Sequence, residues 1–92
     1  MPSDLSTLMT FVAERFRDEE HDRGFAIRHG VLHMTKAVGR LAAECESFDH
    51  GTSMNTAALR ESVVKMLVNT LKLADDVGLS ADELAEGVTA TG

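Results

Sequence analysis

The sequence has one cysteine and one proline, and it lacks tryptophan and tyrosine. A single thiol allows no internal disulfide and no cysteine-based zinc site. Cys45 has apolar neighbours, so we expect a buried, unreactive residue in a reducing cytoplasm. Pro2 precedes every periodic segment, so the rest of the chain contains no proline to interrupt a helix.

Basic residues are also in short supply. Nine lysines and arginines stand against fifteen aspartates and glutamates, which gives a formal net charge of −6, whereas general nucleic-acid binding requires a basic face. No apolar run approaches the roughly 20 residues that span a bilayer. The first ten residues lack the basic start and long apolar run of a secretory signal. We therefore expect a cytoplasmic protein without nucleic-acid or membrane partners.

The abundant residues favour an all-α fold. Good helix formers dominate the interior segments, no stretch alternates in the manner of a β-strand, and 92 residues allow a single domain. Ser3 or Asp4 can cap a first helix, and Gly24 and Gly30 flank an expected bend at residues 25–29. One face of the first helix carries its apolar residues, which are Leu5, Leu8, Met9, Val12 and Phe16.

Three further helices complete the prediction. The second spans about residues 31–48, and the third begins at Asn55 or Thr56 and ends at Gly78, a residue type suited to a C-terminal cap. Ser80 and Glu83 form a capping box for a short fourth helix. The packed core then covers about residues 4–86, and residues 87–92 form a flexible tail. The apolar stripe of the second helix consists of Val31, Met34, Val38, Leu41 and Cys45.

The third helix carries two adjacent apolar seams. A helix with one apolar stripe needs one partner layer, and this helix needs more. We therefore predict a four-helix domain whose bundle is completed by homodimerisation or by a larger helical oligomer. One seam consists of Leu59, Val63, Met66, Thr70, Leu73 and Val77, and the other of Val64, Leu67, Leu71 and Ala74.

Four segments carry a family resemblance. The first is residues 16–19 with Arg23 and Phe25, and the second is Lys36-Ala37-Val38-Gly39-Arg40-Leu41. The third is Arg60-Glu61-Ser62-Val63-Val64-Lys65-Met66-Leu67, and the fourth is residues 73–80. In this order they resemble the MazG-like all-α nucleoside triphosphate pyrophosphohydrolases. The second and third segments are similar to the usual signatures Glu-Glu-Val-Gly-Glu-Leu and Glu-Glu-Leu-x-Asp-Val-Leu. The resemblance implies a dimeric helical core in which acidic residues of two helices hold Mg²⁺ on a nucleotide's phosphates while water releases pyrophosphate.

The four positions that correspond to the family's metal ligands hold Lys36, Arg40, Glu61 and Lys65. Mg²⁺ takes oxygen ligands, whereas ammonium and guanidinium groups offer no lone pair. Each repels a cation by roughly 4 kcal/mol at about 4 Å and an effective dielectric of 20. We therefore expect a degenerate site without cofactor, in a non-catalytic binding or regulatory module.

Two roles for the basic residues remain open. Glu61 precedes Lys65 by four residues, the favourable orientation for a helical ion pair, and Lys36 and Arg40 can neutralise the same carboxylate from the opposite helix. Alternatively, Lys36, Arg40 and Lys65 form a metal-free pocket for phosphate or nucleotide, in which arginine holds phosphate oxygens bidentately.

Other functions are also compatible with the sequence. An active Mg²⁺-dependent pyrophosphohydrolase would use Glu61, Glu44 and acids from residues 14–22. A plain helical interaction module would use no pocket, and a subunit of a larger assembly would receive acids from a different protein. His29 and His33 have the spacing of paired metal ligands on a helix. Because Gly30 is expected to break the helix between them, we interpret both as surface or partly buried residues.

Overall fold

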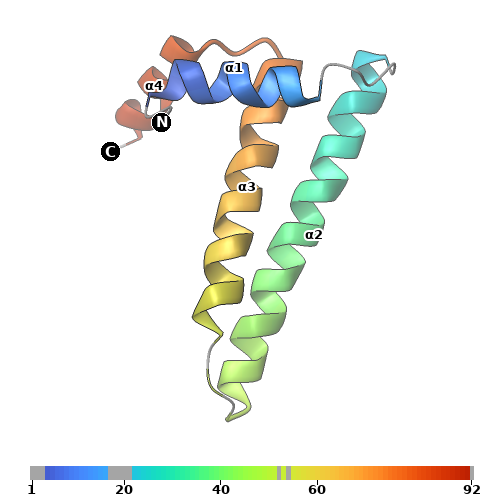
Figure 1. Ribbon diagram of the computed structural model, residues 1–92, viewed down its shortest axis with the longest axis vertical. Helices are drawn as coiled ribbons and strands as arrows, with labels where there is room; N and C mark the ends of the chain where they lie inside the picture. The colour runs from blue at the N-terminus through green and yellow to red at the C-terminus, as the bar shows by residue number, and fades with distance from the viewer. Residues whose placement is uncertain (1–3, 17–21, 52, 54, 92) are drawn as a thin grey trace.

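The chain folds into four α-helices in a computed structural model that describes residues 4–16, 22–51, 53 and 55–91. They are α1 (Leu5–Arg15), α2 (Arg23–Asp49), α3 (Thr56–Asp76) and α4 (Ala81–Ala90), and these described residues contain no strand. Helices α2 and α3 lie side by side as a long antiparallel pair, with α1 and α4 at the end where α3 finishes (Figure 1). The predicted all-α class and the number of helices are confirmed.

Local capping defines the helix ends. Each helix begins after a residue whose side chain accepts a backbone N–H three positions later, which satisfies a donor that the helix leaves free. These residues are Asp4, Asp22, Asn55 and Ser80. Glu83 completes the predicted capping box by accepting the N–H of Ser80 at 3.0 Å. Helix α4 continues to Ala90, so residues 87–90 are helical where the sequence predicted a flexible tail.

Gly78 ends α3 as predicted. It adopts φ +81°, in the left-handed region that glycine enters without a steric penalty. The next N–H, that of Leu79, donates to the carbonyl of Ala74 at 2.8 Å, and the N–H of Gly78 donates to Asp75 at 3.1 Å. This pair of hydrogen bonds is a Schellman motif, which turns the chain sharply towards α4.

The predicted bend at residues 25–29 is wrong, because α2 is continuous from Arg23 to Asp49. Asp22 starts the helix eight residues earlier than expected by accepting the N–H of Phe25 at 2.7 Å. Each glycine inside a helix costs up to about 1 kcal/mol relative to alanine. Gly30 is buried and a Cβ placed there would lie 3.9 Å from Cδ1 of Leu73 in α3. That distance is ordinary van der Waals contact, so the space beside α3 does not itself require glycine at this position.

The hydrophobic core lies between α1 and α3. Met9 and Val12 of α1 meet Leu71 and Ala74 of α3, and all four are buried. The apolar face predicted for α1 is therefore the face that packs. Partly buried residues surround this cluster, namely Leu5, Leu8, Phe16, Val68, Ala81 and Leu84.

The apolar stripe predicted for α2 is largely exposed. The buried residues of α2 are Gly30 and Ala37, whose small size lets the helix approach α3 closely. Val31 and Val38 stay exposed, and so does Cys45, which corrects its predicted burial. The reason is that α3 is the main helix packed against α2, so the edges of α2 are uncovered.

The chain exposes more surface than a compact monomer of its size. Its accessible surface is 6885 Å², against about 5,200 Å² expected from the mass. Its radius of gyration is 15.2 Å, against about 12 Å for a compact domain of this length. The long α2–α3 pair accounts for the extension (Figure 1). Among the described residues, no helix has the length and apolar character to cross a membrane.

Candidate functional site

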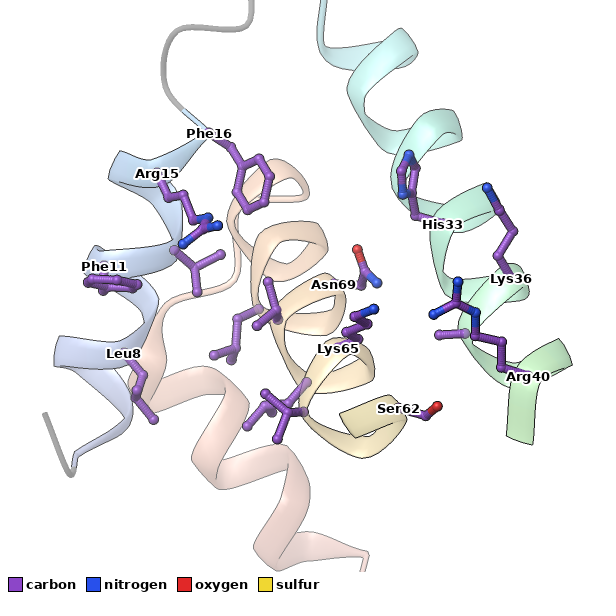
Figure 2. Close-up of a pocket in the computed structure, with 16 residues that line it drawn as sticks. Leu8, Phe11, Arg15, Phe16, His33, Lys36, Arg40, Ser62, Lys65 and Asn69 are labelled. Carbon is purple, nitrogen blue, oxygen red and sulfur yellow. The ribbon is translucent and has the colours of Figure 1, made fainter. Parts of the chain in front are cut away.

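A cleft of about 610 Å³ opens between α1, α2 and α3. This volume falls within the range of about 300–1,000 Å³ that is usual for small-molecule sites. Helix α3 lies between the other two, and Arg15 of α1 and Arg40 of α2 both point towards it (Figure 2). The residues at the cleft are Leu8, Phe11, Val12, Arg15, Phe16, His33, Lys36, Ala37, Arg40, Ser62, Val64, Lys65, Leu67, Val68, Asn69 and Leu71.

The charged residues that are described at the cleft are basic. Four of the nine lysines and arginines line it, and among the described residues no aspartate or glutamate does so. In a chain with a net charge of −6, this concentration runs against the overall balance. A second hollow of about 350 Å³, between α1 and α4, has the opposite character, because Glu14 and Asp75 line it without any lysine or arginine.

Three of the four cations form no ion pair with any described residue. Within the described part of the chain, no carboxylate lies within ion-pair distance of Arg15, Lys36 or Arg40. Like charges held around one cleft repel each other, and an anion placed among them would relieve that repulsion.

Lys65 is the one cleft cation with an acidic partner. Its Nζ donates to Oε1 of Glu61 at 3.0 Å, one turn away on α3, and both side chains are exposed. The Lys65 ammonium holds the pKa of Glu61 below the ordinary value of 4.5, and Arg40 adds a weaker long-range effect. Glu61 itself does not line the cleft. The ion pair expected from the sequence is thus present, on the exposed side of α3.

Lys72 shows by contrast what a structural cation looks like in this fold. Its Nζ donates to Asp76 at 2.8 Å in a partly buried pair and lies 5.8 Å from the ring centroid of Phe16. It fixes the end of α3 beneath α1 and takes no part in the cleft. Arg15, Lys36 and Arg40 form no such pair with any described residue, which separates them from a cation that serves packing.

The structure brings together three of the four positions singled out in the sequence. Lys36 and Arg40 from α2 and Lys65 from α3 line one cleft, and Glu61 lies outside it. Glu44, the other weak metal candidate, is half-buried on α2 and also lies outside the cleft. Among the described residues, no three histidine, cysteine, aspartate or glutamate side chains gather closely enough to hold a metal ion. The acids at residues 18–20 lie outside the described residues.

Arg15, Ser62 and Asn69 are cleft residues that the sequence reasoning missed. Ser62 is the buried polar residue of α3, and Asn69 follows it by seven residues, two turns along the same face. That spacing is a signal available in the sequence. Arg15 has no such signal, because its place depends on how α1 crosses α3.

Comparison of the chain with known proteins found no match. No protein-family model matches the sequence, no curated protein matches it, and no solved structure matches the fold.

Proposed function

We propose that the protein is a non-catalytic module that binds a phosphate-bearing anion in the cleft between α1, α2 and α3 without a metal ion. The observation that carries the proposal is the lining of the cleft by Arg15, Lys36, Arg40 and Lys65, with no carboxylate among the other described residues that line it. In this view the chain is a degenerate relative of the MazG-like pyrophosphohydrolases, in which basic side chains replace the metal as the source of positive charge.

The chemistry of the lining favours phosphate. Arginine offers a planar fork of N–H donors that fits two phosphate oxygens at once, and lysine adds a compact charge. Ser62 and Asn69 add neutral hydrogen-bonding groups on α3. Each cation within about 4 Å of a phosphate charge contributes roughly 1 kcal/mol in a water-like dielectric and roughly 4 kcal/mol at a dielectric of 20.

The apolar part of the cleft favours a ligand that is more than phosphate. Phe11, Val64 and Leu67 line the cleft and stay largely exposed. Apolar surface left in water is unfavourable, and the flat ring of a nucleobase would cover it. A nucleoside triphosphate combines a charged tail with an apolar ring and matches both halves of the lining.

Calorimetric titration in EDTA tests the proposal with three probes: ATP, inorganic triphosphate and adenosine. We expect ATP to bind most tightly, triphosphate more weakly, and adenosine weakest, because each partial probe satisfies one half of the cleft. ATP should also raise the melting temperature in EDTA, since a ligand of the folded state stabilises it. Binding that appears only after Mg²⁺ is added would contradict the proposal.

An active pyrophosphohydrolase is the competing function, with Glu61 and Glu44 as its metal ligands. Pyrophosphate release from nucleoside triphosphates with Mg²⁺ or Mn²⁺ distinguishes the two. Our proposal predicts no release above the rate of the Glu61→Gln variant. Release by the native chain that Glu61→Gln abolishes would establish the enzyme instead.

We also propose that a second copy of the chain covers the face of the α2–α3 pair opposite the cleft. Val38 is two residues from Lys36, and Val63 is two residues from Lys65. Two residues correspond to about 200° of rotation, which puts each valine on the opposite side of its helix from the cleft. Exposed apolar residues continue this face along both helices, namely Val31 and Val77. The surplus of about 1,700 Å² over a compact monomer is larger than the roughly 800 Å² per partner that a standard interface needs.

A further inference from the structure

We infer that His29 and His33 form a chelating site for a divalent transition metal of tetragonal preference, Ni²⁺ or Cu²⁺. The continuity of α2 is what makes the pair a site, because it places the two histidines on one helical face with no break at Gly30. This inference is independent of anion binding in the cleft, although His33 also lines that cleft.

The two imidazoles converge on one point. Nε2 of His29 and Nε2 of His33 lie 2.9 Å apart, and both side chains are exposed. The ring centroids are 4.4 Å apart, with an angle of 62° between the ring planes. In the metal-free chain one Nε2–H donates to the other nitrogen. When Nε2 of neither ring carries a proton, each nitrogen has a free lone pair, and the two lie close enough for one ion to bind both.

Phe25 holds one of the two ligands in place. Its ring stacks on His29 with a centroid distance of 5.3 Å and an interplanar angle of 15°. Stacking restricts the rotation of the imidazole, so less conformational entropy is lost when a metal binds. Phe25 is itself fixed near the start of α2, where its N–H donates to Asp22. The pair is therefore partly organised before any ion arrives.

The closeness of the two nitrogens suits ligation at neighbouring positions of one ion. Cis ligands at a square-planar or octahedral ion, with bonds of about 2.0–2.1 Å, lie about 2.9 Å apart, and the hydrogen-bonded nitrogens already lie at 2.9 Å. Zn²⁺ sites usually take three or four protein ligands, and the described residues offer no third one here. Imidazole is also a ligand that Cu²⁺ and Ni²⁺ favour and that Mg²⁺ and Ca²⁺ do not. Water completes the coordination sphere, because two protein ligands leave positions open.

Calorimetric titration of the tag-free chain with NiCl₂ tests the site. All variants carry Cys45→Ser, because the exposed Cys45 thiol is a competing ligand. We expect one Ni²⁺ per chain, with affinity reduced at least fivefold in both His29→Gln and His33→Gln, since each leaves a single imidazole. His50→Gln is the matched control, because His50 lies alone at the other end of α2, and we expect it to change affinity less than twofold.

The outcomes separate chelation from ordinary surface binding. A loss of less than fivefold in either pair variant, or an equal loss in His50→Gln, would overturn the inference. Electron paramagnetic resonance of the Cu²⁺-loaded chain provides a second readout. Coupling to two imidazole nitrogens in the parent chain and to one in each pair variant supports the site, and a spectrum with no nitrogen coupling overturns it. Circular dichroism checks that every variant keeps its helices.

Discussion

Replacing Arg40 by glutamine removes one unpaired cation from the cleft and leaves the helix intact. Arg40 is exposed on α2, points towards α3, and forms no ion pair with any described residue (Figure 2). Its loss therefore breaks no ion pair with any described residue. Glutamine keeps a similar length and a high helix propensity. The substitution isolates the contribution of a single charge to anion binding.

The magnitude follows from Coulomb's law with a discount for solvent. At about 4 Å from a phosphate charge, the guanidinium contributes roughly 1 kcal/mol in a water-like dielectric and roughly 4 kcal/mol at a dielectric of 20. Because Arg40 is exposed, we take the lower half of this range, about 1–2 kcal/mol. The expected rise in the dissociation constant for ATP is then about 5–30-fold. Raising the salt concentration should shrink the difference between the two proteins, because mobile ions screen exposed charges.

Arg60→Gln is the matched control for Arg40→Gln. It makes the same change in net charge, and Arg60 is exposed on α3 but does not line the cleft. Calorimetric titration with ATP in EDTA should therefore show less than a twofold change for Arg60→Gln. Equal losses in both variants would mean that ATP responds only to overall charge. A change of less than twofold in Arg40→Gln would refute the assignment of the cleft.

Three further predictions concern the fold and its assembly. Gly39→Ala should raise the free energy of unfolding by about 0.5–1 kcal/mol, because a Cβ there meets open space. Gly78→Ala should lower the free energy of unfolding by about 1–2 kcal/mol, because Gly78 has φ +81°. Chemical denaturation measures both changes. The hydrogen bonds from Ser80 hold the pKa of Glu83 below 4.5. The Glu83 carboxylate therefore stabilises the fold fully above pH 4.5, and this contribution is lost as the pH falls through the lower pKa of the folded state. Glu83→Gln should therefore weaken the acid dependence of thermal unfolding below about pH 5. Val63→Glu should shift the chain towards monomer in analytical ultracentrifugation, whereas Val88→Glu, on α4 and similarly exposed at 66% against 59%, should leave the mass unchanged.

The starts of α1, α3 and α4 and the end of α3 were predictable from the sequence because their chemistry is local. Asp4, Asn55 and Ser80 each act on a backbone N–H three residues away. Gly78 likewise acts on the turn that follows it. None of these interactions depends on how the helices are arranged in space, so the identity and order of neighbouring residues were sufficient.

The course of α2 was not predictable from local chemistry. Gly24 and Gly30 disfavour a helix when each is considered alone, and this is why a bend was expected. Gly30 is in fact buried inside the continuous helix, and Leu73 of α3 is the neighbour that a Cβ there would meet. Packing against α3 buries Ala37 on the same helix and leaves Val38 and Cys45 exposed.

The cleft was predictable in part. Lys36 and Arg40 share one helical face by their spacing. That they face Lys65 across the second and third helices was implied by the family resemblance, and all three line the cleft. Arg15 could not be placed, because nothing in the sequence fixes how α1 lies against α3. Glu61 pairs with Lys65 as its spacing predicted, but it does not line the cleft.

The most direct test of metal-free anion binding is to locate the ligand on the protein. A ¹⁵N-labelled chain of 92 residues is suited to chemical-shift mapping during titration with ATP in EDTA. We predict that the largest shifts occur at residues 11–16, 33–40 and 62–69, the three segments that line the cleft. Shifts concentrated on α4 or at the α2–α3 connection, or the absence of any shift at millimolar ATP, would contradict the account.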